Sequence, residues 1–405
     1  MTALTDTVRT LSIVLIVDLL LIVILVLAVV GGAARGLVTS LGALIGLIVG
    51  GFAAYWVAPL LGGLVAEPVW RALVTAGSAV GLLIIGTSVG SALGATVRRG
   101  VDRATPLRVV DRILGAAASL VIAALAVSLV GTTIATTGIP TVSAAVASSR
   151  VLRTIDDLIP SPVQAGIAQL RGTVVAGGIP SLGTLLEPQP AAPQAPISLS
   201  DPDVQRASAS VARISGTAYA CGESLTGTGF AVASNEIMTN AHVVAGVTAP
   251  VVELPGRGAL DGKVVYFDPE DDLAVIRVPG MGATPLRLTS TLGAGAAAVV
   301  SGYPFGGPYT TVDARVESVG HVRVPDIYDH GGAVRDIYAL ASVVHPGDSG
   351  GPLLTGAGTV AGITFARDQK DPGRGYAMTS AMLTPVVSKA VSLTAPVSTG
   401  HCTSE

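Results

Sequence analysis

The residues with the clearest chemical potential form a short turn, Gly347-Asp348-Ser349-Gly350-Gly351-Pro352. Glycines on both sides of the serine allow a turn tight enough to aim backbone amides at one point. A serine hydroxyl is a weak nucleophile at neutral pH, so it requires a base, a group that orients the base, and donors for the oxyanion. The turn therefore predicts a nucleophilic Ser349, provided that the rest of the chain supplies these partners.

Two further segments supply candidate partners. The run Thr239-Asn240-Ala241-His242-Val243-Val244 places His242 directly after a short apolar stretch, and Asp272 opens the strand-like run Leu273-Ala274-Val275-Ile276. The order His, Asp, Ser resembles that of the chymotrypsin-like proteases, whereas subtilisins and α/β-hydrolases use other orders. The resemblance implies that His242 is the general base, that Asp272 fixes its tautomer, and that Ser349 is the nucleophile.

The same resemblance assigns the remaining parts of the site. It places the oxyanion hole at the amides of Gly347 and Ser349, and it prefers Asp272 to the neighbouring Asp271, because the acid of this family directly precedes a Leu-Ala-Val type of run. Trypsin-like relatives carry an acid six residues before the nucleophile, where this chain has Val343. The wall strand, which includes Thr364 and Phe365, is also uncharged, so a substrate pocket for small or apolar side chains is implied.

Each motif has a plainer explanation when taken alone. The glycine-rich segment could be a surface turn, and His242 could be a histidine of the core. Their joint occurrence in one order, about 30 and then about 80 residues apart, favours a serine protease site. The alternative from another class is a catalytically silent, protease-like binding module on a membrane scaffold or pore, which a probe for active serines would not label.

Composition separates two halves of the chain. Of 405 residues, 50% are hydrophobic and only 13% are charged, and the mean hydropathy is +0.66. The apolar excess lies in the first third, whereas the last 200 or so residues have a globular composition. A net charge of −3 and an aromatic content of 4% argue against nucleic acid as a partner. No Cys or His pair has metal-ligand spacing, so no metal and no cofactor is expected.

The first third contains four apolar runs, and each is long enough to cross a bilayer core of about 30 Å. They cover residues 11–32, 38–61, 72–97 and 113–136. We therefore predict an all-α transmembrane bundle of four helices in residues 1–136, in contact with lipid, and not a cleaved signal peptide. Asp18 is the one charge of the first run, either a functional group or a residue at the headgroups. Gly42, Gly46 and Gly50 predict close packing of the second helix on a neighbour.

Orientation follows from the arginines between the third and fourth runs. The five are Arg98, Arg99, Arg103, Arg108 and Arg112. Loops rich in Lys and Arg remain in the cytoplasm, so everything after about residue 137 is predicted to lie on the extracytoplasmic, periplasmic side of the inner membrane. Arg9, which would then lie outside, disagrees with this assignment.

Residues 137–200 are predicted to connect the membrane bundle to the catalytic domain. Val151–Arg171 has apolar residues at helical spacing interrupted by Pro160 and Pro162, which fits either short amphipathic helices or a disordered tether. Residues 187–196 are proline-rich and mark a domain boundary. Since this linker is tethered to its own protease, we hypothesise self-cleavage there, which predicts a fragment near 20 kDa.

Residues 201–405 are predicted to form an all-β domain, and the resemblance implies that it is the chymotrypsin-like double β-barrel. Short β-rich runs alternate with Gly and Asn turns at even spacing, and one helical pattern follows at Met382–Val391. The predicted strands are Val211–Ala220, Thr226–Ala233, Val264–Phe267, Leu273–Val278, Ala298–Gly302, Tyr338–Val344 and Thr359–Ala366. Gly227-Thr228-Gly229-Phe230 lacks the third glycine and the helix of a dinucleotide site, so it predicts a strand with close backbone approach.

The chain has two cysteines, Cys221 and Cys402. Outside the cytoplasm such a pair is readily oxidised, so we predict a disulfide; two free, buried thiols are the alternative. The bridge would close a loop of roughly 180 residues, for which the loop-entropy estimate is at most about 5 kcal/mol.

Two family resemblances follow from these features. Asp18, Arg35-Gly36 and the glycine-rich second run make the first 135 or so residues similar to the colicin V production protein family. Across nearly the full chain, TNAHVVAG around His242, Asp272, GDSGGPL around Ser349, the two cysteines and Pro325-Asp326-Ile327-Tyr328 resemble the MarP family. This resemblance implies a membrane-anchored periplasmic serine endopeptidase, linked to acid and oxidative stress resistance, that acts on proteins or peptides.

The resemblance also has limits. HtrA-type proteases share TNAHVV but append a PDZ domain, and the 56 residues after Ser349 leave no room for one. The Ile-Val-Gly-Gly amino terminus that activates secreted chymotrypsin-like zymogens is missing, so some other device is expected to order the loop around Asp348. A histidine base must be neutral, and an ordinary imidazole titrates near pH 6.5, so activity is expected to fall below about pH 6.

Overall fold

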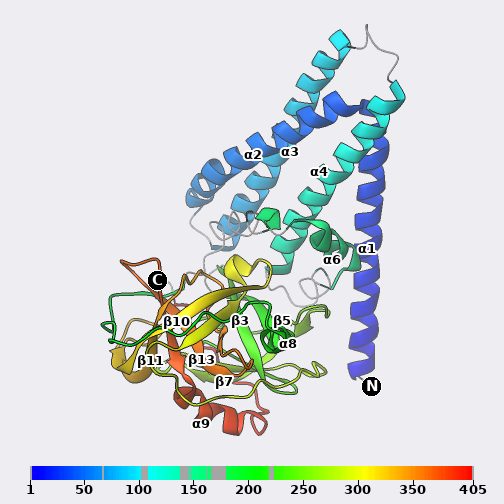
Figure 1. Ribbon diagram of the computed structural model, residues 1–405. Coiled ribbons are helices and arrows are strands. Elements are labelled where there is room, and N and C mark those ends of the chain that lie inside the picture. Colours follow the sequence, from blue (N-terminus) through cyan, green and yellow to red (C-terminus); the bar gives the residue numbers. More distant parts are fainter. Residues whose placement is uncertain are drawn as a thin grey trace. The chain divides into compact units, whose positions relative to one another are not determined.

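The computed structural model describes residues 2–65, 68–101, 108–136, 146, 148–160, 162–164, 166, 179–218 and 223–403. They divide into two compact units (Figure 1). The helical unit comprises Met1–Thr132 and Ser149–Leu158, and the β unit comprises Thr133–Ser148 and Ile159–Glu405.

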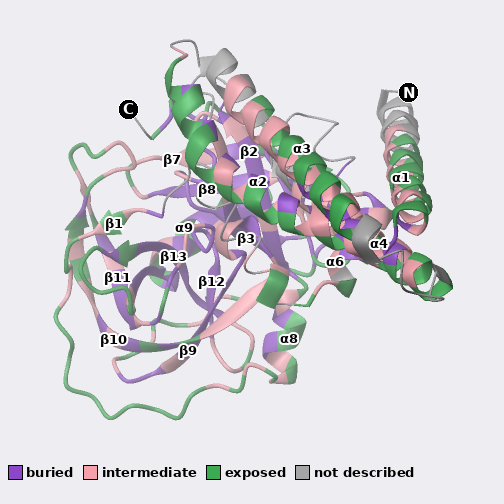
Figure 2. Cartoon of the chain, turned by 90° about the horizontal axis from the view of Figure 1, so that it is seen from above, coloured by how far each residue is buried: buried purple, intermediate pink, exposed green. Residues whose placement is uncertain are grey.

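The helical unit is built from four long helices, α1 (Thr2–Arg35), α2 (Leu37–Gly63), α3 (Pro68–Val101) and α4 (Arg108–Thr136). Each contains a stretch that is long and apolar enough to cross a membrane. Large apolar side chains such as Ile45, Phe52 and Leu93 are exposed on these helices, in contrast to the mostly buried strands (Figure 2). The prediction of four apolar N-terminal helices is confirmed.

Glycines hold α2 against α3. A Cβ atom added to Gly46 would lie 2.0 Å from the carbonyl oxygen of Gly86, and one added to Gly42 would lie 2.3 Å from that of Gly90. Only glycine permits such backbone contact. The predicted packing face of the second helix is therefore present, and its partner is the matching glycine row of α3.

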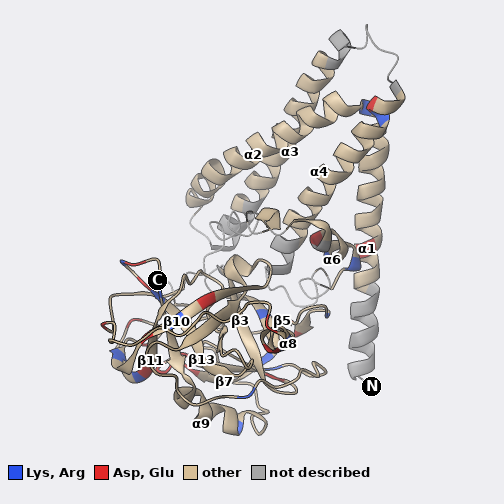
Figure 3. Cartoon of the chain, viewed as in Figure 1, with Lys and Arg blue, Asp and Glu red and all other residues tan. Residues whose placement is uncertain are grey.

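Polar contacts in this unit cap helix ends. Along the parts of α1 to α4 that Figure 3 colours, charges are few except where α1, α2 and α4 come together. There Asp111 Oδ1 accepts a 2.9 Å hydrogen bond from Leu37 N, at the start of α2. Asp18 of α1 accepts a 2.6 Å hydrogen bond from Ser149 Oγ, directly before α6 (Arg150–Leu158). Asp18 thus fixes the start of α6, since acids favour helix N-termini.

The first sheet of the β unit has seven strands in the order β6-β5-β2-β3-β4-β8-β7. Their bounds are β2 (Val211–Ala218), β3 (Glu223–Ala233), β4 (Glu236–Thr239), β5 (Val251–Glu253), β6 (Leu260–Asp261), β7 (Lys263–Asp268) and β8 (Leu273–Arg277). Its central strands are apolar on both faces, which suits burial on both sides. One such face forms a core with Ile214, Ile237 and Ile276.

The second sheet also has seven strands, in the order β1-β13-β12-β9-β10-β11-β14. Their bounds are β1 (Ser181–Leu182), β9 (Ala297–Gly302), β10 (Thr310–Val324), β11 (Ala333–Ala341), β12 (Pro352–Leu354), β13 (Val360–Asp368) and β14 (Arg374–Thr379). Because β14 also pairs with β13, six of these strands close on themselves. Phe230 and Met238 of the first sheet share a core with Ile337 and Phe365 of the second.

All the predicted strands are present, with shifted ends, and the predicted C-terminal helix is α9 (Ser380–Ala390). The short turn η1 (Pro304–Gly306) follows β9. The longest of the described strands, β10, was not predicted, because Asp313, Arg315 and Glu317 interrupt its apolar residues. The fold is the trypsin-like one that the sequence predicted.

The proline-rich segment runs along the β unit. Gln189 N donates to Glu317 O and Gln194 N donates to Gly295 O, both at 2.9 Å. After it, Asp201 caps α8 (Pro202–Ser208) by accepting from Asp203 N at 2.8 Å. Residues 187–196 thus lie on the barrel surface, exposed but hydrogen-bonded to it.

Candidate active site

The pairing of β4 with β8 brings His242 and Asp272 together. Thr239, the last residue of β4, pairs with Ala274 near the start of antiparallel β8. His242 lies three residues after one strand end, and Asp272 lies just before the other strand begins. The imidazole Nδ1 is 2.9 Å from Asp272 Oδ2 and 3.0 Å from Oδ1.

Asp272 is held in this position from several directions. Its Oδ1 also accepts a 3.0 Å hydrogen bond from His242 N, and its carbonyl oxygen accepts one of 2.9 Å from Asn240 Nδ2. Its backbone φ is +54°, a conformation that non-glycine residues rarely adopt. Since a carboxylate can only accept, Nδ1 carries the ring proton and Nε2 is left with a free lone pair, as a general base requires.

Thr228 of β3 holds the nucleophile turn. Its hydroxyl donates to Gly347 O at 2.6 Å and accepts from Tyr303 N at 3.0 Å, while its amide donates to Ser349 O at 2.8 Å. Thr228 is fully buried. The sequence predicted the close backbone approach of Gly227-Thr228-Gly229 but not that Thr228 holds the turn. The hydroxyl group between two glycines was the feature that could have indicated this role.

The turn itself depends on glycine. Gly350 has φ +82°, and a Cβ atom there would lie 2.0 Å from Thr228 O; Gly347 has φ +95°, with Tyr303 O at 2.4 Å from its Cβ position. Within the described part of the chain, the amides of Gly347 and Ser349 donate to no protein acceptor. Both are thus free to donate to an oxyanion.

Ser349 Oγ and His242 Nε2 are both buried, and neither has a hydrogen-bond partner among the described residues. Catalytic hydrogen bonds are often long before substrate binds, so this geometry is compatible with a base and nucleophile that meet in the substrate complex.

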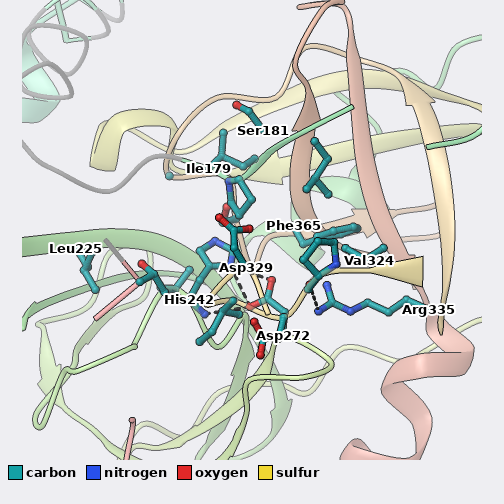
Figure 4. Close-up of a pocket in the computed structure, with 18 of the residues that line it drawn as sticks. Ile179, Ser181, Leu225, His242, Asp272, Val324, Asp329, Arg335 and Phe365 are labelled. Atoms are coloured by element: carbon teal, nitrogen blue, oxygen red, sulfur yellow. Dashed lines mark hydrogen bonds and ion pairs between the residues drawn. The ribbon is translucent and has the colours of Figure 1, made fainter. Parts of the chain in front are cut away.

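A cavity of about 340 Å³ contains these groups. His242, Asp272, Gly347 and Ser349 line it, and its apolar wall comes from Leu225, Val243, Val324, Ile327 and Phe365. Figure 4 shows His242 and Asp272 near one end of the cavity and Ile179 and Ser181 toward the other. Of the three predicted pocket residues, Phe365 lines the cavity; Val343 is 41% exposed and Thr364 is fully buried, and neither is among the described residues that line it.

Arg335 of β11 is a buried cation beside the site, and the sequence analysis did not identify it. Its Nη2 donates to Glu270 O at 2.6 Å and to Pro325 O at 3.0 Å, so it fastens the loop that precedes Asp272. Its guanidinium lies 5.7 Å from the centre of the Phe365 ring. Burial lowers the pKa of Arg335, and the carboxylates of Asp272 and Asp271 oppose that shift.

Asp348 lies within the nucleophile turn and is buried. Burial raises the pKa of this carboxyl to about 7, although Asp348 Oδ2 accepts a 2.9 Å hydrogen bond from His345 N. The Asp348 carboxyl thereby closes the turn from residue 345 to residue 348 by a hydrogen bond within the turn. Asp348 and Thr228 are the residues that hold the loop around Ser349 in this structure.

Only one of the two cysteines of the predicted disulfide, Cys402, is among the described residues. Cys402 is buried beside Ala218, Leu225 and Val247. Cys221 lies outside the described residues, so the bridge remains a prediction. No cluster of three or more possible metal ligands occurs in the part of the chain that the structure describes.

Two protein families match this chain. Residues 227–363 match the trypsin-like peptidase domain, and residues 17–160 match the colicin V production protein. Together with the paired sheets and the cavity that both His242 and Ser349 line, these matches identify a trypsin-like serine protease that also carries a colicin V production-like membrane region.

Comparison with individual proteins shows which serine proteases this chain resembles. Serine protease Rv3671c of Mycobacterium tuberculosis strain H37Rv is 33% identical over 315 residues, which cover 76% of this chain and 78% of that protein. The crystal structure of the active form of the Rv3671c protease has 34% identity and a TM-score of 0.51, and it covers 55% of this chain and 100% of that one. Protease Do-like 1 of Arabidopsis thaliana is 32% identical over 134 residues, 32% of this chain and 30% of that protein. The chain belongs to the MarP family of serine proteases, which includes Rv3671c.

Proposed function

We propose that this serine protease is an endopeptidase that uses Ser349, His242 and Asp272 as its catalytic triad. The observation that carries the proposal is the His242–Asp272 hydrogen bond of 2.9 Å at the wall of the cavity that Ser349 also lines. Four apolar helices anchor the enzyme in a membrane.

In the proposed mechanism, Ser349 Oγ attacks the carbonyl carbon of a peptide bond while His242 Nε2 accepts the hydroxyl proton. The amides of Gly347 and Ser349 stabilise the oxyanion. The imidazolium then gives its proton to the departing amine, which leaves an ester between Ser349 and the acyl group. Water, deprotonated by His242, hydrolyses this ester and restores the free serine. Asp272 stabilises the imidazolium during both steps.

The triad is tested with the full-length protein and its Ser349→Ala variant. Hydrolysis of an apolar peptide library is expected to fall by about 10⁵-fold or more in the variant, and a fluorophosphonate probe should label only the wild type. Binding of peptides without labelling of the wild type would instead favour the catalytically silent module.

The cavity supports a preference for small or apolar residues at the cleaved position. Leu225, Val243, Val324 and Phe365 form the apolar part of its wall. Asp326 and Asp329 also line it, and Asp326 Oδ1 already accepts hydrogen bonds from the amides of Tyr328 and His330. Peptides with Ala, Val or Leu before the cleaved bond should therefore be hydrolysed faster than matched peptides with Lys.

The five arginines between the third and fourth apolar runs support a β unit on the extracytoplasmic side. Digestion of intact spheroplasts with an added protease tests this: the β unit should be degraded from outside, and its survival until lysis would reverse the orientation. A role in acid and oxidative stress rests on the family, and survival of cells that carry only Ser349→Ala enzyme would test it.

Self-cleavage is proposed for the exposed linker at residues 187–196. Its exposure makes it accessible, although its hydrogen bonds to Glu317 and Gly295 must first break. Membranes with wild-type enzyme should then contain a fragment near 20 kDa that is missing with Ser349→Ala.

A further inference from the structure

The short strand β1 pairs with β13 in parallel, with Ser181 opposite Arg367 and Leu182 opposite Asp368. Arg367 N donates to Pro180 O at 3.0 Å, and Gln369 N donates to Leu182 O at 2.8 Å. We call residues 179–186, which contain this strand, the strap.

Further contacts fasten the strap to the second sheet. Tyr376 OH accepts from Leu185 N at 3.2 Å, and Arg367 Nε donates to Ser181 Oγ at 3.1 Å. Leu182, Leu185 and Leu186 pack against the shared core, and Ile179 is only 5% exposed. The strap is thus a bound segment rather than a loose tether.

The strap lies on the edge of β13 that also holds the nucleophile turn. Thr364 N donates to Gly351 O and Thr364 O accepts from Gly350 N, both at 2.9 Å. Further along β13, the groups beyond Thr364 bond to the strap. Ile179, Pro180, Ser181 and Leu182 accordingly line the same cavity as His242 and Ser349 (Figure 4).

An extended peptide gains affinity by adding to an open strand edge. The edge of β13 next to Thr364 is where such a peptide would have its carbonyl carbon within reach of Ser349. The strap already uses Arg367 N and Gln369 N of this edge. Since β1 and β13 are parallel, each residue of the strap from Pro180 to Leu182 lies farther along β13 from Thr364 than the one before it. The peptide bonds of the strap therefore lie progressively farther from Ser349.

We propose that the strap occupies the peptide-binding edge of the protease and that extended peptide substrates must displace it. The inference rests on the proposed protease function and adds a regulatory contact to it. The strap also indicates what the edge binds: an extended backbone with a branched apolar side chain, as Ile179 presents to the apolar wall.

The test compares three forms of the full-length protein in detergent: wild type, Ile179→Asp and Pro190→Ala. Pro190→Ala is the control, since Pro190 lies in the exposed proline-rich segment that follows the strap. Hydrogen exchange at Arg367 N and Gln369 N reports strap binding independently of catalysis. The rate of fluorophosphonate labelling and kcat/KM for an apolar peptide report access to Ser349. A second variant with residues 179–182 replaced by Gly-Ser-Gly-Ser guards against an effect specific to the aspartate.

In both strap variants, the two amides should exchange faster and kcat/KM should rise by about five- to tenfold, through a lower KM, because a larger fraction of molecules is competent to bind. Pro190→Ala should match wild type. Faster exchange at both amides with unchanged kcat/KM would overturn the inference. Failure of the wild type to be labelled at all would refute the proposed triad, whereas equal labelling and equal kcat/KM in all forms would refute only the strap.

Discussion

The α2–α3 pair and the β unit achieve close packing in opposite ways. In the helix pair, Gly42, Gly46 and Gly50 omit side chains so that two backbones touch. In the β unit, large side chains such as Phe230, Tyr338 and Arg335 fill the space between strands and are fully or almost fully buried. Lipid provides no hydrophobic force between helices, whereas water drives large apolar groups inward. The helix pair should therefore be sensitive to added atoms and the β unit to removed ones.

The largest loss is expected when atoms are removed at Arg335. Arg335→Ala removes a buried guanidinium together with its hydrogen bonds to the carbonyls of Glu270 and Pro325 and opens a cavity, which should lower the free energy of unfolding by about 3 kcal/mol. Because the loop before Asp272 loses its attachment, kcat should fall more than KM rises. Urea unfolding and steady-state kinetics measure both effects.

The control is Arg323→Ala, which removes an exposed arginine that also donates to a carbonyl, that of Gly332. This change should alter stability by no more than about 0.5 kcal/mol. Equal losses in the two variants would contradict the importance of burial at Arg335.

The next largest effect tests added atoms. Gly46→Leu inserts a side chain where even a Cβ would lie 2.0 Å from Gly86 O, and it should destabilise the helix pair by about 2 kcal/mol. Unfolding of the full-length protein in mixed SDS micelles, followed by the fluorescence of Trp56, measures this loss.

Gly81→Leu on α3 provides the matched control, since no described atom lies within 4 Å of its Cβ position. A loss as large as that of Gly46→Leu would show that added volume in general, and not backbone contact, limits this pair.

A smaller effect is expected when only a hydroxyl is exchanged for a methyl group. Thr228→Val keeps the volume but removes the hydrogen bonds to Gly347 O and Tyr303 N, at a cost of roughly 1 to 3 kcal/mol. This cost corresponds to about a 5- to 150-fold lower rate if it falls on the transition state. We expect kcat to fall with little change in KM. Thr228→Ser, which keeps the hydroxyl, should recover most of the rate, and failure of this rescue would count against the hydrogen bonds.

A further prediction concerns pH. The pKa of Asp348 is raised to about 7 by burial, so between about pH 4 and pH 7 the folded state binds a proton that the unfolded state lacks. This group therefore makes the protein more stable as pH falls through that window. Asp348→Asn should remove this contribution, so its Tm should rise less than that of wild type between pH 8 and pH 5.

Asp368 supplies the opposite case. Burial opposes its ionisation, but hydrogen bonds from Tyr376 OH and from the amides of Lys370 and Asp371 hold its pKa down to about 2. Its contribution is present above about pH 4 and is lost as pH falls toward 2. The same pH dependence in Asp348→Asn and Asp368→Asn would contradict these assignments.

The sequence predicted the features that are local. GDSGGP, the segment around His242 and the four apolar runs each occupy contiguous residues, so chain order and period were enough. The partner of Gly46 was also open to prediction, since Gly86, Gly90 and Gly94 repeat the same four-residue spacing.

Features that depend on distant pairing could not be predicted. Thr228 bonds to a residue 119 positions away, and Arg335 to one 65 positions away, so neither leaves a local pattern. The contacts of the strap with β13 were not predicted for the same reason: the composition of residues 187–196 indicates a linker, whereas the backbone hydrogen bonds from Arg367 N and Gln369 N to the strap form only in the folded barrel. Val343 was placed by counting back from Ser349, which ignores how the loop turns.

The site needs both sheets, because Thr228 of the first sheet holds the turn that carries Ser349. His242 and Asp272, the proposed base and its acid, lie at strand ends of the first sheet, whereas Ser349, the proposed nucleophile, lies next to β12 of the second. Thr228, which holds the turn around Ser349, is again from the first sheet. If these residues form the triad, a chain in which only one sheet has formed has no competent hydrolase, so peptide hydrolysis requires that both sheets be folded and docked.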